Sequence, residues 1–298
     1  AVVAFIDPHK VQLAISSFQP YKAPGPDDYP PVVLQNLPAK AIKYLTAVYK
    51  QAVGQTTIPT RWKEMKVAFI PKLGKGDYST PKAYRPITLS NFTLKALERV
   101  IQWYINENHV TRPLACQHAY TKGYSTESAL TSFVDAVESM VMRGKKVMAV
   151  SLDCSGAFDR IKFSSAEQAM SRHAIPKAVV KWYDYLLKNR RVTATIKGIS
   201  RTVTPTKGSP QGGILSPLVW NLIMDTLLSK FDKRSPVKAV GYADDILLYI
   251  QGTVPSVMQS LLQSALERVA EWGTTNGLEF NPAKTQAILF ERGYGKKP

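Results

Sequence analysis

Acidic residues stand next to apolar runs at two places in this chain, where a strand would end. Asp244 and Asp245 lie between two apolar runs, a pattern that predicts a β-hairpin with adjacent carboxylates at its tight turn. Asp153 follows the strand-like run 147–152. Adjacent carboxylates repel each other, so a bound cation is the natural reason to place them together. Three carboxylates at two strand ends are the ligand set of a two-metal phosphoryl-transfer centre.

The charge of the chain indicates a polyanionic partner. Its 298 residues include 39 Lys and Arg against 22 Asp and Glu, which gives a net charge of +17. A chain that is this basic and also 45% hydrophobic is typical of a globular protein that binds nucleic acid. A basic surface that serves only solubility is the alternative. Together with the acidic residues, the charge favours a nucleic-acid polymerase.

Several other protein classes do not fit. The sequence has no run of about 18 uninterrupted apolar residues, so we expect no membrane span. It does not begin with a basic and then apolar signal pattern, and its two cysteines, Cys116 and Cys154, fit a reducing compartment. The four histidines are scattered without the spacing of a zinc site. We therefore expect an intracellular protein.

The elements that must position the acidic residues alternate between helices and strands. The opening stretch is rich in proline and predicts irregular structure. The order of strand, helices, hairpin and helix predicts an α+β fold, with an antiparallel sheet backed by helices. The predicted helices are 39–53, 90–108, 126–143, 165–173, 176–188, 215–231 and 255–276, and the predicted strands are 67–70, 147–152, 191–196, 201–205, 237–240, 246–250 and 286–290.

Four motifs also occur in the order found in reverse transcriptases: Asp153-x5-Asp159, Gly208-Ser209-Pro210-Gln211-Gly212, Tyr242-Ala243-Asp244-Asp245 and Asn281-Pro282-x-Lys284-Thr285. Three flanking stretches resemble those of non-LTR retrotransposons, particularly jockey-like elements: Lys22-Ala23-Pro24-Gly25-Pro26-Asp27, Tyr84-Arg85-Pro86-Ile87 and Gln117-His118-Ala119-Tyr120. The resemblance extends from about residue 20 to residue 290. It implies an RNA-directed DNA polymerase that adds dNTPs to a primer 3′-hydroxyl on an RNA template.

The resemblance assigns a metal-binding role to the carboxylates. Asp153 and Asp244 resemble the two bridging ligands, Asp245 an auxiliary ligand, and the backbone carbonyl of Cys154 a further one. They imply two Mg²⁺ ions, which Mn²⁺ can replace. One ion would activate the primer 3′-hydroxyl and the other would hold the triphosphate and the leaving pyrophosphate. A plain surface turn is the alternative for the Asp-Asp pair, and Asp159 is expected to be structural.

Other residues are assigned to the nucleotide by the same resemblance. Lys72 and Arg85 resemble residues that grip the β- and γ-phosphates, although a solvated basic face would also explain them. Phe158 resembles the bulky residue that excludes a ribose 2′-hydroxyl, and an ordinary core phenylalanine is its alternative. Gln211 would contact the incoming nucleotide, or simply belong to a loop that leads into a helix. Lys284 resembles a general acid, with a surface lysine as its alternative.

Five further residues are predicted near the primer and template, namely Gly208, Ser209, Pro210, Gly212 and Tyr242. The implied partners are an RNA template, a DNA primer or RNA–DNA hybrid, and dNTPs, with no membrane and with the oligomeric state open. The five tryptophans are predicted to be core residues because most of them stand at helical spacing from apolar neighbours.

The resemblance implies a right-hand polymerase fold with helical fingers and an antiparallel palm sheet. Fingers with an N-terminal extension are expected over 1–147 and the palm over 148–298, with a fingers insertion at about 160–205. The thumb that normally follows is expected to be absent, as is an upstream endonuclease domain, which leaves the activity of this chain alone open. A target-primed element would be made in the cytoplasm and work in the nucleus.

Two other functions remain open at this point. An RNA-dependent RNA polymerase shares the layout of the acidic residues, but Phe158 and the Tyr-x-Asp-Asp sequence argue against it. An inactive or domesticated nucleic-acid-binding relic is the second, and the joint presence of the acidic motifs with Arg85 and Gln211 argues against that.

Overall fold

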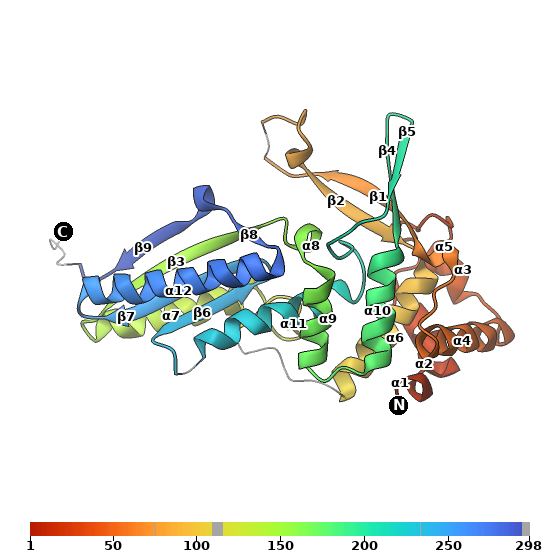
Figure 1. The fold of residues 1–298 in the computed structure, drawn as a ribbon, viewed down its shortest axis with the longest axis horizontal. Coiled ribbons are helices and arrows are strands. Elements are labelled where there is room, and N and C mark those ends of the chain that lie inside the picture. The colour runs from red at the N-terminus through yellow and green to blue at the C-terminus, as the bar shows by residue number, and fades with distance from the viewer. Residues whose placement is uncertain (75, 109–115, 233, 294–298) are drawn as a thin grey trace. The chain divides into compact units, whose positions relative to one another are not determined.

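The computed structural model describes residues 1–74, 76–108, 116–232 and 234–293. The chain forms two compact units, each of which contains two separate segments (Figure 1). Unit 1 consists of Ala1–Val110 and Ile161–Val219, and unit 2 of Thr111–Arg160 and Trp220–Pro298. The fingers and palm predicted from the sequence are functional divisions. They remain predictions and are not equated with these two units.

Unit 1 is mainly helical. Its core includes the fully buried side chains of Tyr49, Leu97, Ile101 and Trp182, which come from three different helices. The α-helices are α1 (Val2–Phe5), α2 (Pro8–Ser16), α3 (Pro31–Gln35), α4 (Ala39–Gly54), α5 (Thr60–Lys63), α6 (Phe92–Asn108), α9 (Phe163–Arg172) and α10 (Lys177–Asn189), with a short 3-10 helix at Pro81–Ala83.

The proline-rich stretch 20–30 is irregular, as predicted, but the opening residues before it and the residues directly after it form short helices. Helix α2 begins with Pro8 at its first turn, and the side chain of Asp7 accepts a hydrogen bond from the backbone N–H of Lys10. Helix α3 likewise begins with Pro31. A proline is well tolerated in the first turn of a helix because the N–H that it lacks would have no partner within the helix.

A four-stranded sheet completes unit 1. Strand β1 (Glu64–Pro71) pairs antiparallel with β2 (Tyr84–Ser90) and parallel with β4 (Arg191–Ile196), and β4 pairs with β5 (Ile199–Val203). The β4–β5 hairpin follows directly on α10 (Figure 1). Its turn residues Lys197 and Gly198 have φ angles of 49° and 80°, the signs of a type I′ turn.

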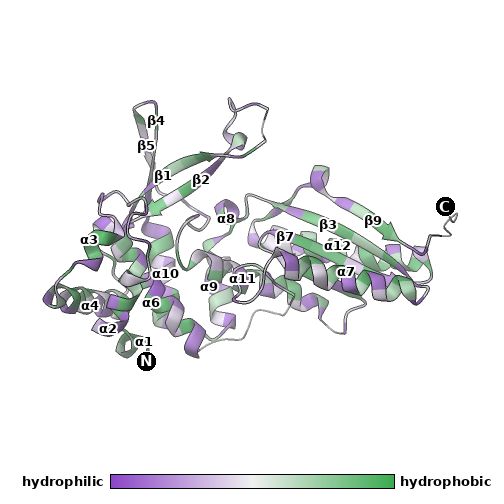
Figure 2. Cartoon of the chain, turned by 180° about the vertical axis from the view of Figure 1, so that it is seen from behind, coloured by the Kyte–Doolittle hydropathy of each residue, from purple (hydrophilic) through white to green (hydrophobic). Residues whose placement is uncertain are grey.

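Unit 2 is built around an antiparallel sheet in the order β6-β7-β3-β8, with β9 also paired to β3. The strands are predominantly apolar (Figure 2). They are β3 (Lys146–Ser155), β6 (Val237–Tyr242), β7 (Asp245–Gly252), β8 (Glu279–Phe280) and β9 (Gln286–Phe290). Its helices are α7 (Thr126–Met142), α8 (Ala157–Arg160), α12 (Pro255–Asn276) and α11 (Ser216–Leu228), of which α11 begins in unit 1, with 3-10 helices at Ser229–Phe231 and Pro282–Lys284.

Helices cover both faces of this sheet. Phe133 of α7 packs edge-on against Tyr249 and Phe290, which lie on one face. Met258 of α12 lies against Gly252 on the other face, where Leu248 and its neighbours are buried. Alternation along the strands places Asp153 and Asp245 on the face of α7. Within the described residues, no helix is both long and apolar enough to cross a membrane.

Candidate active site

The acidic turn lies between β6 and β7, as the two apolar runs predict. Tyr242 pairs with Asp245, so that Ala243 and Asp244 form a two-residue turn. Ala243 has a φ angle of 55°, whereas Asp244 is not among the residues with positive φ. These are the φ signs of a type II′ turn, in which glycine usually takes the first position. The turn therefore presents Asp244 at its tip.

Asp153 lies on the neighbouring strand β3, directly across from Asp245 in the strand register. Lys284 bonds to it, with Nζ 2.8 Å from Oδ1 of Asp153. The backbone N–H of Asn281 also donates to the Asp153 carbonyl at 2.9 Å. The structure thus brings together the predicted residues Asp153, Asp245 and Lys284 at one end of the sheet.

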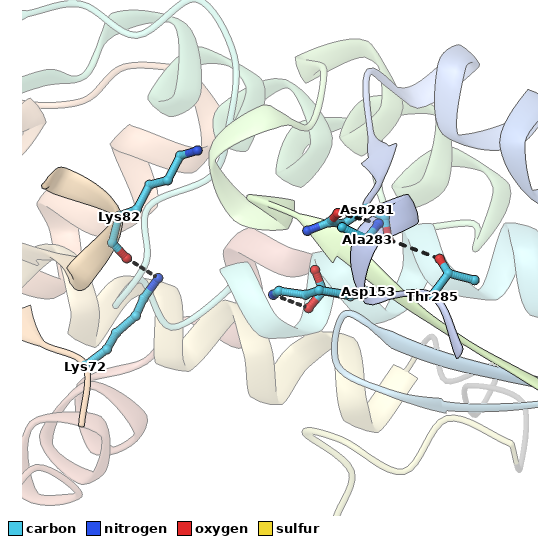
Figure 3. A network of polar contacts seen from close by, with 7 residues as sticks. Lys72, Lys82, Asp153, Asn281, Ala283 and Thr285 are labelled. Atoms are coloured by element: carbon cyan, nitrogen blue, oxygen red, sulfur yellow. Dashed lines mark hydrogen bonds and ion pairs between the residues drawn. The ribbon is translucent and has the colours of Figure 1, made fainter. Parts of the chain in front are cut away.

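The Asn-Pro-x-Lys-Thr motif folds into a compact turn that supports this arrangement (Figure 3). The Asn281 side chain accepts a hydrogen bond from the backbone N–H of Ala283 at 3.1 Å. Thr285 Oγ1 donates to the Asn281 carbonyl at 3.0 Å. These bonds hold the short 3-10 helix Pro282–Lys284, and so fix the base of the Lys284 side chain.

The carboxylates shift one another's titration. Burial raises the pKa of Asp244, and the nearby charge of Asp153 raises it further, against the opposing effect of Lys284. Burial also raises the pKa of Asp245, with additional contributions from Asp244 and Asp153. The hydrogen bond to Asp153 raises the pKa of Lys284. One ammonium group therefore faces three mutually repelling carboxylates, a surplus of negative charge that a divalent cation would neutralise.

The geometry of a loaded metal site is not formed by the described side chains. Among them, no three Asp, Glu, His or Cys residues are grouped closely enough to hold an ion. Asp153 instead pairs with Lys284. The donor chemistry still fits, because oxygen ligands from few carboxylates are what Mg²⁺ takes beside a phosphate substrate.

Cys154 lies next to Asp153 and has a buried side chain. Burial, together with the charges of Asp244 and Asp153, raises the pKa of its thiol to about 12. A thiol held in its neutral form is a poor nucleophile, so a role for Cys154 would fall to its backbone carbonyl.

Phe158 belongs to an aromatic group beside these residues. Its ring lies 5.4 Å from that of Trp220 at an interplanar angle of 33°. It also meets Tyr120 edge-on at 6.4 Å. Phe158 is half-buried and could present one side of its ring to a substrate. Tyr242, on β6, lines a cavity of about 270 Å³ together with Leu130 and other residues of α7.

Two buried side chains hold the peptide groups of Ala243. The indole Nε1–H of Trp220 donates to the Ala243 carbonyl at 2.9 Å. The Oε1 atom of Gln117 accepts from the N–H groups of Ala243 at 3.3 Å and Ala119 at 3.1 Å. Sequence reasoning placed Gln117 in a motif without a role and Trp220 in the core. The only feature of the sequence that indicated a polar role for Trp220 was the N–H group that every indole carries.

The other predicted group of residues lies in unit 1, in the loop before α11. Gly208 N–H donates to the Ile161 carbonyl at 2.7 Å. Ser209 Oγ lies 3.0 Å from the hydroxyl of Tyr183 and donates to Ser216 Oγ at 2.8 Å. Both ends of the loop are thereby fixed within unit 1.

Strand β2 approaches the middle of this loop closely. The backbone N–H of Thr88 donates to the Gln211 carbonyl at 2.7 Å. Gly212 has a φ angle of 122°, and a Cβ atom there would lie 2.5 Å from the Thr88 carbonyl oxygen. Only glycine permits this approach. Pro210 closes the next turn by accepting from the N–H of Gly213 at 3.1 Å.

A buried glutamate that sequence reasoning missed holds the end of the loop. Glu98, on α6, is 1% exposed, and its Oε2 atom accepts from the backbone N–H of Ile214 at 3.2 Å. Burial raises the pKa of Glu98 to about 7, although Lys95 and Arg99 act in the opposite direction. The periodicity of α6 predicted the helix but gave no sign of a carboxylate on its buried side.

Lys72 and Arg85 lie on the β1–β2 hairpin of unit 1. Arg85 is exposed and pairs with Ile70 in the strand register, and Lys72 follows β1. Lys72 Nζ donates to the Lys82 carbonyl at 3.0 Å (Figure 3). The predicted site residues are therefore divided between the units. Asp153, Cys154, Phe158, Tyr242, Asp244, Asp245 and Lys284 lie in unit 2, and Lys72, Arg85, Gly208, Ser209, Pro210, Gln211 and Gly212 in unit 1.

Comparison with known proteins agrees with these motifs. Residues 70–297 match the family model described as reverse transcriptase (RNA-dependent DNA polymerase). A probable RNA-directed DNA polymerase from transposon BS of Drosophila melanogaster is 29% identical over 283 residues, which cover 91% of this chain and 31% of the relative. The RNA-directed DNA polymerase from mobile element jockey of the same organism is 25% identical over 288 residues, with 93% and 31% covered. The chain thus spans less than a third of the length of these relatives.

A solved structure shares the fold. Telomerase from Candida tropicalis, in complex with a fragment of telomeric RNA, superposes with a TM-score of 0.58 at 12% identity, over 86% of this chain and 45% of that one. With the family match, this likeness confirms the α+β polymerase fold and the resemblance seen in the sequence.

Proposed function

Because the chain belongs to the reverse transcriptase (RNA-dependent DNA polymerase) family, we propose that it extends a primer 3′-hydroxyl with deoxynucleotides on an RNA template, as the polymerase part of a non-LTR retrotransposon protein. The observation that carries this proposal is the register of Asp153 opposite Asp245, beside the turn that presents Asp244. Lys284 partly offsets the charge of these residues.

Asp153 and Asp244 would bind two Mg²⁺ ions, with Asp245 and the Cys154 carbonyl as auxiliary ligands, and Mn²⁺ could substitute. When bound, such ions lower the pKa of the primer hydroxyl and stabilise the charge on the leaving pyrophosphate. Lys284 contacts one carboxylate oxygen of Asp153, and an ion bound at that oxygen would displace the lysine. The freed ammonium group would then be available to donate a proton to pyrophosphate, because a lysine side chain is charged at neutral pH even without a partner.

Unit 1 would supply the grip on the nucleotide. Lys72 and Arg85 carry the positive charges proposed to bind the β- and γ-phosphates, Arg85 through two N–H groups at once. The tightly held loop 208–213 keeps Gln211 in one place, as contact with the incoming nucleotide and template base would require. In unit 2, Phe158 would exclude a ribose 2′-hydroxyl. Tyr242 would lie near the primer end.

The partners proposed are an RNA template, a DNA primer or RNA–DNA hybrid, and dNTPs. A template-bound primer is a polyanion, and the net charge of +17 supports its binding. Target-primed copying would take place at chromosomal DNA, so we propose that the protein works in the nucleus after synthesis in the cytoplasm.

Primer extension on an RNA template tests the proposal. With dNTPs and Mg²⁺ or Mn²⁺, we expect extension that Asp244→Asn lowers by more than about a hundredfold, since removal of even a supporting residue at a metal site costs up to that much. Asp135→Asn is the matched control, because Asp135 is an exposed carboxylate on α7 of the same unit. Equal activity of Asp244→Asn and wild type would overturn the assignment.

Two further outcomes identify the alternatives. Extension with NTPs in preference to dNTPs would point to an RNA polymerase. Binding of primer and template without metal-dependent nucleotide binding would point to a relic that has lost its chemistry. Both results would contradict the proposed function.

A further inference from the structure

The turn that carries Asp244 contains a backbone conformation that alanine disfavours. Ala243 has a φ angle of 55°, in the left-handed region where a Cβ atom crowds the following carbonyl. The two-residue hairpin turn imposes this conformation on Ala243, although it is unfavourable for a residue with a Cβ atom. Hydrogen bonds that hold the peptide groups of Ala243 would offset part of this cost.

Trp220 and Gln117 hold the peptide groups of Ala243 from two sides. The Trp220 indole N–H bonds to the Ala243 carbonyl at 2.9 Å, and Gln117 Oε1 receives the Ala243 N–H at 3.3 Å. Both side chains are only 2% exposed. Hydrogen bonds away from water are stronger and more directional than exposed ones. Gln117 is itself fixed, since His118 N–H bonds to the Gly241 carbonyl at 2.9 Å, and Gly241 N–H bonds to the Cys116 carbonyl at 2.7 Å.

The indole of Trp220 has a second contact that concerns the substrate side of the site. Its ring lies 5.4 Å from that of Phe158 at 33°, a tilted stack that restricts where the Phe158 ring can sit. One side chain therefore touches both the turn that carries Asp244 and the ring proposed to sense the sugar. A phenylalanine at this position could keep the second contact but not the first.

Two other buried tryptophans show that the bond to Ala243 is not a general feature of burial. Trp182, in unit 1, is fully buried, and its indole N–H has no hydrogen-bond partner among the described residues. Trp272, in unit 2, donates to Thr226 Oγ1 at 2.8 Å, away from the acidic turn. The three residues thus provide a bonded indole at the site, a bonded indole elsewhere and an unbonded one.

We propose that Trp220 is a positioning residue that holds the Ala243 peptide through its N–H and the Phe158 ring through its face, so that the catalytic carboxylate and the sugar-sensing ring keep a fixed relation. Gln117 is the second holder of the same peptide. The inference rests on the proposed polymerase function, and it adds a link between the rate of addition and the choice of sugar.

The two contacts can be separated by substitution. Trp220→Phe removes the N–H and keeps a ring, so we expect kcat for dNTP addition to fall about tenfold, as small misplacements of catalytic groups do. KM and the preference for dNTPs over NTPs should change by less than about twofold, because Phe158 keeps its neighbour. Trp220→Leu removes both contacts and should lower the rate and the preference, in the direction of Phe158→Val. Trp272→Phe is the matched control, because it loses a buried indole bond in the same unit and should change neither quantity.

A double-mutant cycle with Ala243→Gly tests the mechanism. Glycine adopts positive φ without crowding, so the turn should no longer depend on the indole N–H. We expect Trp220→Phe to cost about threefold or less in the Ala243→Gly background, against about tenfold in the wild type. Multiplicative effects of the two substitutions would overturn the proposal, as would a tenfold loss in Trp272→Phe.

A spectroscopic measurement decides the proposal even if the chain does not extend primers, in which case the proposed function fails separately. With ¹⁵N-labelled indoles, the signal lost in Trp220→Phe identifies Trp220. We expect this N–H to exchange slowly with D₂O and to shift in Ala243→Gly, while the Trp182 signal stays in place. A Trp220 signal that does not shift in Ala243→Gly, or that exchanges as fast as an exposed amide, would overturn the proposal.

Discussion

At the scale of single residues, one short segment acts on both the backbone and the side chain of Asp153. Asn281 N–H bonds to the Asp153 carbonyl, and Lys284 bonds to its carboxylate three residues later. A cation near Asp153 would compete with Lys284 for the same oxygen. Binding of a cation at this oxygen would therefore release the lysine toward the substrate.

The proposed donation of a proton by Lys284 can be tested by replacing the lysine with a residue of lower pKa. A histidine titrates near pH 6.5, whereas the pKa of Lys284 is raised above the ordinary lysine range. We expect the single-turnover rate of Lys284→His to fall about tenfold as the pH rises from 6 to 8, since the imidazolium loses its proton. The wild type should show no such fall.

Lys230→His is the matched control, because Lys230 is an exposed lysine of the same unit. It should follow the wild-type pH profile. A Lys284→His profile that parallels the wild type would remove Lys284 from the role of general acid.

At the scale of elements, helix α6 and the loop 208–213 depend on each other through one carboxyl group. Glu98 lies on the buried side of α6, and its Oε1 atom has no partner among the described residues. Its Oε2 atom receives the N–H of Ile214. Burial favours the protonated form, so the pKa of Glu98 is raised to about 7 from 4.5.

This shift makes the stability of the fold depend on pH in a definite direction. Between about pH 4.5 and 7 the unfolded chain has lost the Glu98 proton while the folded chain retains it. The raised pKa of Glu98 therefore stabilises the folded state fully below about pH 4.5. This contribution is lost as the pH rises through 7, and the free energy of unfolding falls by about 3 kcal/mol in total. Glu98→Gln removes this dependence. We therefore expect the Tm of the variant to rise relative to wild type between pH 5 and 7.5, as measured by thermal unfolding.

Glu107→Gln on the same helix serves as the control, since Glu107 is exposed. Its Tm difference from wild type should not change with pH. A constant difference for Glu98→Gln as well would contradict the raised pKa.

The elements also show how far the sequence can predict this structure. The apolar runs around Asp244 and the period of 255–276 predicted the acidic hairpin and helix α12, because both patterns are local. The roles of Trp220 and Glu98 could not be predicted in this way. Trp220 bonds to a residue 23 positions away, and Glu98 to one 116 positions away. Which polar group faces which buried side chain is decided by packing between distant segments, and periodicity carries no information about it.

At the scale of the whole molecule, the positive charge is divided very unequally between the two compact units. Unit 1 contains 24 Lys and Arg and 9 Asp and Glu, a net charge of +15. Unit 2 contains 15 and 13, a net charge of +2. Unit 2 carries the catalytic carboxylates, whose repulsion for phosphates must be offset elsewhere. Attraction of nucleic acid should therefore come mainly from unit 1.

Salt dependence of binding measures this division. We expect the affinity for an RNA–DNA hybrid to fall at least about tenfold between 50 and 200 mM salt, through release of counterions. Removing three exposed charges of unit 1 should lower the slope of log K against log salt by up to about 3, and removing three of unit 2 by less than about 1. Fluorescence anisotropy gives the slopes. The first set is Arg172→Gln, Lys177→Gln and Lys181→Gln, and the second is Lys122→Gln, Arg143→Gln and Lys145→Gln.

Equal slopes for the two sets would show that the charge of unit 1 does not govern binding. A slope near zero for the wild type would contradict nucleic-acid binding through phosphates altogether.

The β4–β5 hairpin shows how a strand pair keeps its register with little burial. Ile196, Ile199 and Val203 are each more than half exposed, so the core cannot fix which residues face which way. On the opposite face, Thr193 and Thr202 share a hydrogen bond at 2.8 Å, as do Thr195 and Ser200. A slip by one residue would break both pairs and exchange the two faces. The hydrogen bonds between these hydroxyl groups thus fix the register of the two strands. Arg201 places a charge on the outermost strand, which discourages a second chain from pairing with that open edge.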